Sequence, residues 1–279
     1  MVNNTTNQNQ LIQEQVANFV VEPLQAASVI LNSGATIIDS AAPVKIPRIV
    51  STSGVGFVGE GEKIPDNYTV EASELRLMPE ERKSLKVISR VTNELIRSAA
   101  VGVSQMLQKR IVEDMRVELD EALLTGDGAD DGPTGLFEQP GVTTGTLDLT
   151  EPDTFLDGIA LAAAQDVTPD RWIMNAQDFI EVRKIKDADG RYILQPDMTQ
   201  AGQFQLQGIP VSTSNRVPRG KAALLNIGEL IVVRDTDPQI TTLNERYAEY
   251  DQTGIRVTSR YDLGLARPSG VVILEQDAE

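Results

Sequence analysis

The sequence predicts an α+β fold, because a long amphipathic helix separates a ribbon of strands from a later series of short strands. Apolar residues recur every three or four positions over 101–124, which is the spacing of a helix with one buried face. Residues 46–58 and 68–91 are predicted to be two extended strands joined by a glycine-rich segment. After residue 170, short apolar runs alternate with Gly and Pro turns.

The N-terminal part of the chain is expected to form an arm. Residues 1–10 are polar and uncharged, and apolar residues at helical spacing follow over 11–32. Pro23 interrupts that pattern, so we expect two short helices or one kinked helix. Two prolines within residues 36–50 prevent a helix, so that segment is expected to be extended.

The predicted ribbon has a glycine-rich tip. Residues 54–59 match the pattern G-x-G-x-x-G, but residues 60–65 cannot form the first turns of the helix that a dinucleotide site requires. A hairpin with several glycines is therefore the better interpretation. Since a two-stranded ribbon is only marginally stable alone in water, this one must lie on its own domain or on a neighbouring subunit.

The helix over 101–124 is the strongest predicted element. Opposite charges lie four residues apart in three pairs, which stabilises an exposed helix face. These pairs are Lys109/Glu113, Arg110/Asp114 and Arg116/Asp120. A short helix capped by Thr92 is expected over 92–98, and Thr125 with Gly126 is expected to end the long helix.

The second half of the chain is expected to add two helices and several short strands. The predicted helices are 152–165 and 176–186. The predicted strands are 171–174, 191–194, 209–213, 222–227, 230–234, 239–243, 254–260 and 270–275. Trp172, the single tryptophan, is expected to pack in the core.

The composition excludes several kinds of chemistry. The 279 residues include no His and no Cys, so the chain has no Ser-His-Asp triad, thiol nucleophile, Cys/His zinc site or disulfide. The net charge of −16 argues against general binding of duplex DNA or of an anionic membrane. No apolar run approaches the roughly 20 residues that span a bilayer. We therefore expect a protein that is not an enzyme, has no cofactor and does not bind membranes.

Acidic residues concentrate in one stretch, since positions 117–170 contain 13 of them and no Lys or Arg. Four residues in it match positions 1, 5, 6 and 12 of a calcium loop: Asp127, Asp131, Gly132 and Glu138. Position 3 is Ala129, which has no ligand oxygen, so an acidic turn on a solvated face is the better interpretation. A metal-dependent enzyme is a weaker alternative. Its ligands would be Asp127, Asp130, Asp131 and Glu138.

Seven short motifs follow one another between about residues 40 and 275. They are Phe57-Val58-Gly59-Glu60-Gly61 with Ile64-Pro65; Val91-Thr92-Asn93-Glu94-Leu95; Leu124-Thr125-Gly126-Asp127-Gly128 with Pro133-Thr134-Gly135-Leu136; Trp172-Ile173-Met174-Asn175; Lys186-Asp187-Ala188-Asp189-Gly190-Arg191-Tyr192; Gly208-Ile209-Pro210-Val211; and Tyr261-Asp262-Leu263-Gly264 with Pro268. Each motif is weak alone, but the ordered set resembles the tailed-bacteriophage major capsid protein family, which has the Hong Kong 97-type fold.

The resemblance implies a domain plan. Residues 1–47 would be the N-terminal arm, 48–90 the extended loop and 148–238 the axial domain. Residues 91–147 and 239–279 would together form the peripheral domain.

The resemblance also implies a structural role in the virion. Many copies would close, as hexamers and pentamers, into an icosahedral shell around double-stranded DNA, after assembly in the cytoplasm of a host bacterium. Separate scaffolding, portal and decoration proteins are further partners that the resemblance allows. Because the chain begins with Met1 close to the arm, we expect scaffolding to be a separate protein or to be absent.

The extended loop is expected to make contacts between subunits. The candidate contact residues are Phe57, Glu60, Lys63, Arg82 and Lys83. Some family members cross-link a loop Lys to a peripheral-domain Asn with the help of a Glu, and here these residues would be Lys63, Asn244 and Glu245 or Glu249. The register of these residues is poor, so Lys63 is interpreted as a contact residue.

The acidic composition further predicts an inner wall that repels packaged DNA, so isolated subunits should bind DNA weakly even at low salt. An encapsulin-like bacterial compartment shares the fold and would enclose an enzyme instead of DNA. The long ribbon and the polar arm favour the phage interpretation.

Overall fold

The centre of the fold is the helix α5, Val103–Thr125, which confirms the predicted long helix. The computed structural model describes residues 24, 28–53, 69–94, 103–186, 189–192, 204–235, 239–243 and 245–276. Buried side chains on α5 recur every four residues: Ile111, Met115, Leu119 and Leu123. They belong to the largest apolar cluster, which also contains residues from three different sheets.

A three-stranded antiparallel sheet packs against α5, in the order β11, β12, β4. These strands are Gln239–Leu243, Gln252–Ser259 and Leu85–Thr92. Leu85 and Val87, two residues apart on β4, point to the same face of the sheet and pack against the α5 cluster. Ile255 on β12 packs against the same cluster. The alternation therefore places one face of this sheet under the helix.

A second three-stranded sheet has the order β1, β10, β13. The strands are Thr36–Asp39, Leu230–Arg234 and Tyr261–Leu265. β1 runs parallel to β10, whereas β13 is antiparallel to it. The Arg234 guanidinium pairs with the Asp39 carboxylate through two hydrogen bonds of 2.6 and 2.9 Å, which fixes β1 against β10. The short helix α3, Val29–Asn32, precedes β1.

A six-stranded mixed sheet has the order β5, β14, β9, β6, β8, β7. In that order the strands are Thr143–Thr146, Val272–Glu275, Lys221–Leu225, Arg171–Met174, Ile209–Thr213 and Gln205–Leu206. The helices α6, Asp153–Ala164, and α7, Ala176–Arg183, cover one face of it. Trp172 is fully buried there and meets the Phe155 ring edge-on at 5.6 Å, which confirms its predicted core position.

The ribbon consists of β2, Val44–Ser53, and β3, Thr69–Leu77, which pair only with each other in the described part of the chain. The prediction of a single strand over 68–91 is wrong. β3 ends at Leu77, the chain turns, and β4 then pairs with β12 in another sheet. Both strands alternate in the same way, but Pro79 and the charged run at 80–83 between them were the signal of this break.

Most of the other predicted elements are confirmed with small shifts of their ends. The predicted strands at 171–174, 209–213, 230–234 and 239–243 match β6, β8, β10 and β11. β13 was not among the predicted strands, and residues 191–192 form only a single bridge, between Tyr192 and Lys186. The predicted helix at 92–98 lies mostly outside the described residues.

The sheet pairing also bears on the predicted domain boundaries. β5 and β14 fall within the ranges assigned to the peripheral domain, yet they pair inside the six-stranded sheet. β10 falls within the range assigned to the axial domain, yet it pairs with β1 and β13. Each sheet is therefore assembled from distant parts of the sequence.

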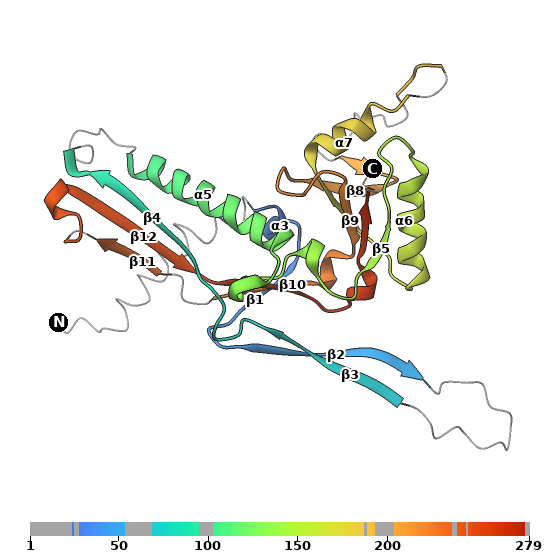
Figure 1. Cartoon of the computed structure of the whole chain (residues 1–279), viewed down its shortest axis with the longest axis horizontal. Helices are drawn as coiled ribbons and strands as arrows, with labels where there is room; N and C mark the ends of the chain where they lie inside the picture. Colours follow the sequence, from blue (N-terminus) through green and yellow to red (C-terminus); the bar gives the residue numbers. More distant parts are fainter. Residues whose placement is uncertain are drawn as a thin grey trace, which may run out of the picture.

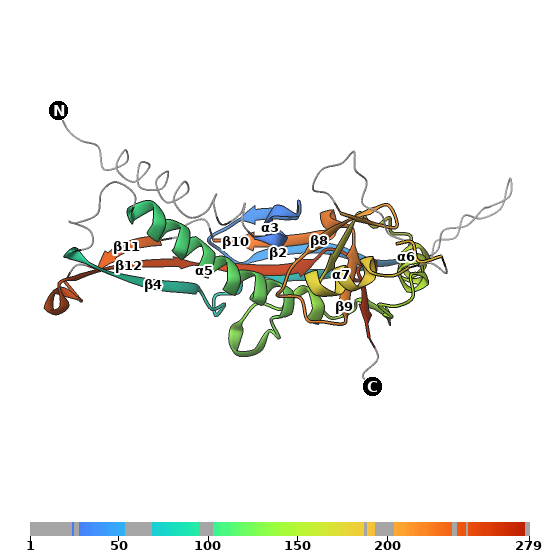
Figure 2. The same ribbon diagram turned by 90° about the horizontal axis from the view of Figure 1, so that it is seen from above.

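The molecule is elongated (Figure 1). β4, β11 and β12 lie with α5 at one end, the six-stranded sheet with α6 and α7 lies at the other, and the ribbon β2–β3 extends away from the body. Figure 2 shows the same division from above, with α5 lying along β4 and β12. Within the described residues, no helix combines the length and apolarity needed to cross a membrane.

Candidate assembly site at the ribbon base and the N-terminal anchor

The predicted contact residues fall into two groups. Three of them, and the Asn of the predicted cross-link, lie outside the described residues: Phe57, Glu60, Lys63 and Asn244. Arg82 and Lys83 are described and lie in the turn between β3 and β4. Glu245 and Glu249 are exposed near the start of β12.

The turn after β3 is held by one buried carboxylate, that of Asp262 in β13. Its Oδ2 accepts hydrogen bonds from the backbone N–H of Met78 at 2.7 Å and from Nη2 of Arg82 at 2.9 Å. Its Oδ1 accepts from the backbone N–H of Leu263 at 2.9 Å. Asp262 is only 1% exposed. A buried charge is tolerated when it is paired and hydrogen-bonded, and these three donors meet that condition.

Arg82 and Lys83 also tie the turn to the loop that follows α5. Arg82 Nη1 donates to the carbonyl of Gly132, and the Lys83 N–H donates to the carbonyl of Asp131 at 3.0 Å. The side chain of Arg82 is 14% exposed, whereas Lys83 is exposed. Arg82 therefore has a role inside the chain, and contact with another subunit stays a prediction for both residues.

Met78 is the residue at which the chain leaves the ribbon. Its φ of 56° lies in the left-handed region, which costs about 1–2 kcal/mol for a residue with a side chain. Its side chain is 1% exposed and packs with Leu77, Ile231 and Val233. Burial and the bond to Asp262 together hold the backbone in this conformation.

Gly264 in β13 is the position at which the seat of the ribbon, its packing contact with the body, is closest. A Cβ at this position would lie 2.8 Å from Cδ2 of Leu77 and 3.0 Å from Cδ2 of Leu75. Arg48 of β2 adds a second tie, because its Nε donates to Ser73 Oγ at 2.7 Å and its Nη1 to the Leu265 carbonyl at 3.4 Å. Within the described residues, the ribbon is therefore fixed to the body near its base.

Gly264→Ala should lower the free energy of unfolding by about 1–2 kcal/mol, because the added methyl group must displace two packed leucines. Urea unfolding followed by circular dichroism measures this cost. Gly228→Ala is the matched control, since its Cβ would meet only the Asn226 side chain at 3.2 Å. Equal urea midpoints for Gly264→Ala and the wild type would show that the seat is loose.

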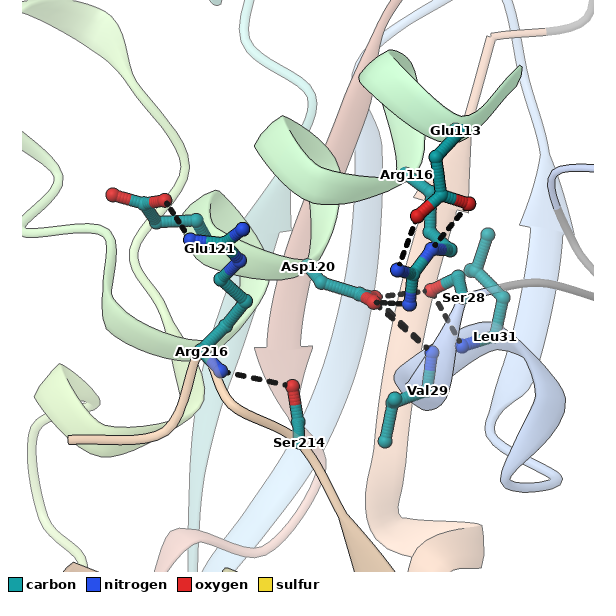
Figure 3. Close-up of polar contacts among 9 residues, drawn as sticks. All are labelled: Ser28, Val29, Leu31, Glu113, Arg116, Asp120, Glu121, Ser214 and Arg216. Atoms are coloured by element: carbon teal, nitrogen blue, oxygen red, sulfur yellow. Dashed lines mark hydrogen bonds and ion pairs between the residues drawn. The ribbon is translucent and has the colours of Figure 1, made fainter. Parts of the chain in front are cut away.

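A second buried carboxylate, Asp120 of α5, anchors the start of α3 (Figure 3). Its Oδ1 accepts from the Ser28 hydroxyl at 2.6 Å and from the Val29 N–H at 3.1 Å. Ser28 Oγ in turn accepts from the Leu31 N–H at 3.3 Å and caps α3. Because α3 has only four residues, these bonds and its buried side chains hold it in place.

Burial raises the pKa of Asp120, while the hydrogen bonds from Ser28 and Val29 and the charge of Arg116 oppose that rise. Arg116 Nη1 lies 3.8 Å from Asp120 Oδ2, but Nη2 donates to Glu113 at 2.7 Å. This hydrogen bond lowers the pKa of Glu113. Arg116 therefore serves mainly Glu113, and the negative charge of Asp120 is only partly compensated.

Asp120→Ala should destabilise the protein by about 2–3 kcal/mol, since it leaves the buried Ser28 hydroxyl and the Val29 N–H without their acceptor. Asp120→Asn keeps an acceptor oxygen and removes the buried charge, so its cost at pH 7 should be much smaller. Urea unfolding of both variants measures the difference.

The pH dependence gives a second check on Asp120. The pKa of Asp120 is higher in the folded state than in the unfolded state. The contribution of Asp120 to the stability of the fold is therefore fully present below the unfolded-state pKa and is lost as the pH rises through the folded-state pKa. Acidification from pH 7 should therefore stabilise the wild type relative to Asp120→Asn. An unchanged difference between the two proteins across that range would contradict the assignment.

The acidic loop after α5 has a packing role. Asp127 Oδ1 accepts from the Ala129 N–H at 2.9 Å, and Leu136 and Phe137 are buried in the α5 cluster. Gly135 passes so close to the end of α5 that a Cβ would lie 2.5 Å from the Leu124 carbonyl carbon. Among the described residues, no group of three or more acidic side chains is placed to hold a metal ion.

Sequence reasoning missed the roles of Ser28, Asp120 and Asp262 in these ties. It placed Asp120 with Arg116 on an exposed helix face, whereas Asp120 is 1% exposed. Asp120 left a signal, because it lies eight residues after Val112 and three before Leu123, on the apolar side of α5. Asp262 left a weaker one, as the single charge in the buried run Tyr261–Leu265. A charge at a position that the pattern makes apolar indicates a buried polar contact.

Comparisons with known proteins extend over nearly the whole chain. The family model described as the phage capsid family matches residues 8–276. The major capsid protein of Klebsiella oxytoca phage phiKO2 is 22% identical over 296 residues, which cover 94% of this chain and 67% of that protein. The capsid of a native GTA particle superposes with a TM-score of 0.72 at 18% identity over 90% of each chain. The capsid of cyanophage A-1(L) gives 0.66 at 14% identity over 94% of each chain.

Proposed function

Because this chain belongs to the phage capsid family, has the Hong Kong 97-type fold and is a structural capsid protein, we propose that its copies close, as hexamers and pentamers, into an icosahedral shell around double-stranded DNA. The ribbon carries this proposal. β2 and β3 pair only with each other in the described part of the chain, where their contacts with the body gather at the base of the ribbon, against β10 and β13. A two-stranded ribbon is marginal in water, so a neighbouring copy supplies the rest of its contacts.

The proposed domain plan follows the sheets. The predicted arm of 1–47 then ends before β2, which begins at Val44, and the predicted extended loop of 48–90 ends at the turn before β4, with its rigid base at Asp262. α5 with β4, β11 and β12 forms the core of the peripheral domain, and the six-stranded sheet with α6 and α7 forms the core of the axial domain. β5 and β14 pair with the axial strands, which moves them into that domain.

Contacts of the ribbon with neighbouring copies are assigned to its outer part. Phe57, Glu60 and Lys63 lie near the predicted tip, whereas Arg82 and Lys83 lie at the fixed base. We assign the tip residues to contacts between subunits. Lys83, which is exposed, is the base residue better placed to join them.

The charge of the chain supports a shell that confines DNA without binding it tightly. With a net charge of −16, the subunits repel a phosphate backbone at low salt. Assembly in the host cytoplasm and the use of separate scaffolding, portal and decoration proteins belong to the same proposal.

Electron microscopy of the purified full-length protein, expressed in bacteria, tests the proposal. Closed shells of uniform size are expected, and the isolated subunits should show weak, salt-sensitive binding to DNA. A protein that stays monomeric at all concentrations and has a protease-resistant ribbon would overturn the proposal of a shell. Shells that enclose a co-expressed enzyme and exclude DNA would favour a compartment of the encapsulin kind.

A further inference from the structure

Two helices lie over the same face of the six-stranded sheet, toward opposite edges. α6 contacts β5, β14 and β9, which are the first three strands in the sheet order. α7 shares its apolar cluster with Leu206 of β7, and its Phe179 ring lies 5.2 Å from the Phe204 ring just before β7. Figure 1 shows α6 beside β5 and α7 near β8. The domain therefore has one flank formed by α6 and another formed by α7.

The α6 flank is acidic around an exposed apolar residue. Asp153 and Asp157 on the helix, and Glu151 just before it, are all exposed. Leu156 lies among them and is 48% exposed. No Lys or Arg occurs between positions 117 and 170, so no basic residue of this segment offsets their charge.

The α7 flank is basic around an exposed apolar residue. Ile180 is 52% exposed, and Lys184 and Lys186 are exposed at the end of the helix. The two carboxylates of α7 are already paired, because Arg219 lies 3.0 Å from Asp178 and 2.6 Å from Glu181. One guanidinium offsets only one of these two negative charges, so the excess of positive charge beside Ile180 comes from Lys184 and Lys186 together with Arg183.

We propose that these flanks are the two halves of one contact, in which the α6 flank of one copy docks against the α7 flank of the next copy around a capsomer. This inference rests on the proposed function. Leu156 would meet the region of Ile180, and Asp153 and Asp157 would lie against Lys184 and Lys186. Exposed apolar side chains rimmed by opposite charges are the features that two such surfaces share with known interfaces.

The charges also specify the direction of this contact. An α6 flank facing another α6 flank, or α7 facing α7, would place like charges together, which disfavours that pairing. A two-fold pair is therefore disfavoured, and a head-to-tail contact is favoured. Repeated rotation by a fixed angle closes such heterologous contacts into a ring.

Charge reversal tests the proposal. Asp157→Lys and Lys184→Asp should each reduce the assembled fraction, measured by light scattering and microscopy, by about tenfold or more, because each places like charges in the contact. The variant with both substitutions restores opposite charges at each contact and should assemble to within about twofold of the wild type. Glu138→Lys is the matched control, since it changes an exposed acidic residue outside both helices by the same charge.

The outcomes separate this inference from the proposed function. Wild-type protein that forms no particles would overturn the proposed function itself. Wild-type particles together with normal assembly of both single variants, or no recovery in the double variant, would overturn the α6–α7 contact alone. Melting curves identify any charge-reversal variant that fails to fold. In that case the neutral substitutions Asp157→Asn and Lys184→Gln are tested in its place, and each is again expected to reduce assembly.

Discussion

Asp262→Ala should lower the free energy of unfolding by about 3–5 kcal/mol, because it breaks a buried ion pair from one side. The substitution leaves the Arg82 guanidinium, which is 14% exposed, without its carboxylate. It also removes the acceptor of the Met78 N–H, at a residue whose left-handed backbone depends on that bond. The ribbon should then lose its fixed angle to the body.

Urea unfolding gives the stability cost, and limited proteolysis of the segment around Met78 reports the local release. Glu138→Ala is the control, because that carboxylate is exposed. Arg82→Met combined with Asp262→Leu should cost less than Asp262→Ala alone, since an apolar pair leaves no buried charge unpaired. A small loss for Asp262→Ala, comparable with that of Glu138→Ala, would mean that the clamp does not hold the ribbon.

Trp172→Ala should cost about 3–5 kcal/mol, since it empties a fully buried site in the six-stranded sheet. The space around Trp172 is tightly filled, because a Cβ on Gly158 of α6 would lie 3.3 Å from the indole and 3.0 Å from Leu274. The sheet therefore cannot collapse into the vacated volume, and the cavity that remains adds to the loss of stability. The position of α6 on the sheet depends on the same contact.

Circular dichroism must follow the unfolding of this variant, because Trp172 is the single tryptophan and its fluorescence disappears with it. Trp172→Phe is the control, and its cost should be smaller because the ring contact with Phe155 is retained. The indole Nε1 has no hydrogen-bond partner among the described residues, so its loss carries no polar penalty. A Trp172→Ala protein as stable as Trp172→Phe would refute tight packing at this site.

The elements that sequence reasoning predicted well are those whose pattern is local. The repeat of Ile111, Met115, Leu119 and Leu123 predicts α5, and the short segment 171–174, with three apolar residues after Arg171, predicts β6 with its correct ends. Such patterns depend on which face of one segment is buried, and the sequence alone carries that information. They do not depend on which partner covers the face.

Pairing between distant segments was not predictable in the same way. β3 and β4 have similar alternation, yet one pairs with β2 and the other with β12. The break at Met78 is determined by Asp262, which lies 184 residues away along the chain. Its left-handed φ is unusual for a residue with a side chain, so the residue type gives no warning of the turn.

The sequence predicted where the candidate assembly site lies, but not which side chains hold it together. The sequence located the ribbon and named Arg82, but the structure shows that the guanidinium acts within its own chain. Ser28 and Asp120 were invisible as a pair, because 92 residues separate them and hydrogen bonds of that range have no sequence period. The charge of Asp120 within an apolar helix face was the usable signal.

The last strands of the chain have a consequence for the order of folding. β12, β13 and β14 follow one another within Gln252–Glu275, yet each belongs to a different sheet. β12 is the central strand of one sheet, and β14 is an interior strand of another. During synthesis on the ribosome this segment emerges after every other strand of the three sheets, so none of the three is complete until it has been made. A nascent chain that has not yet reached this segment, or one that terminates before it, therefore lacks the finished surfaces that would recruit other copies, and recruitment waits until β12, β13 and β14 have joined their sheets.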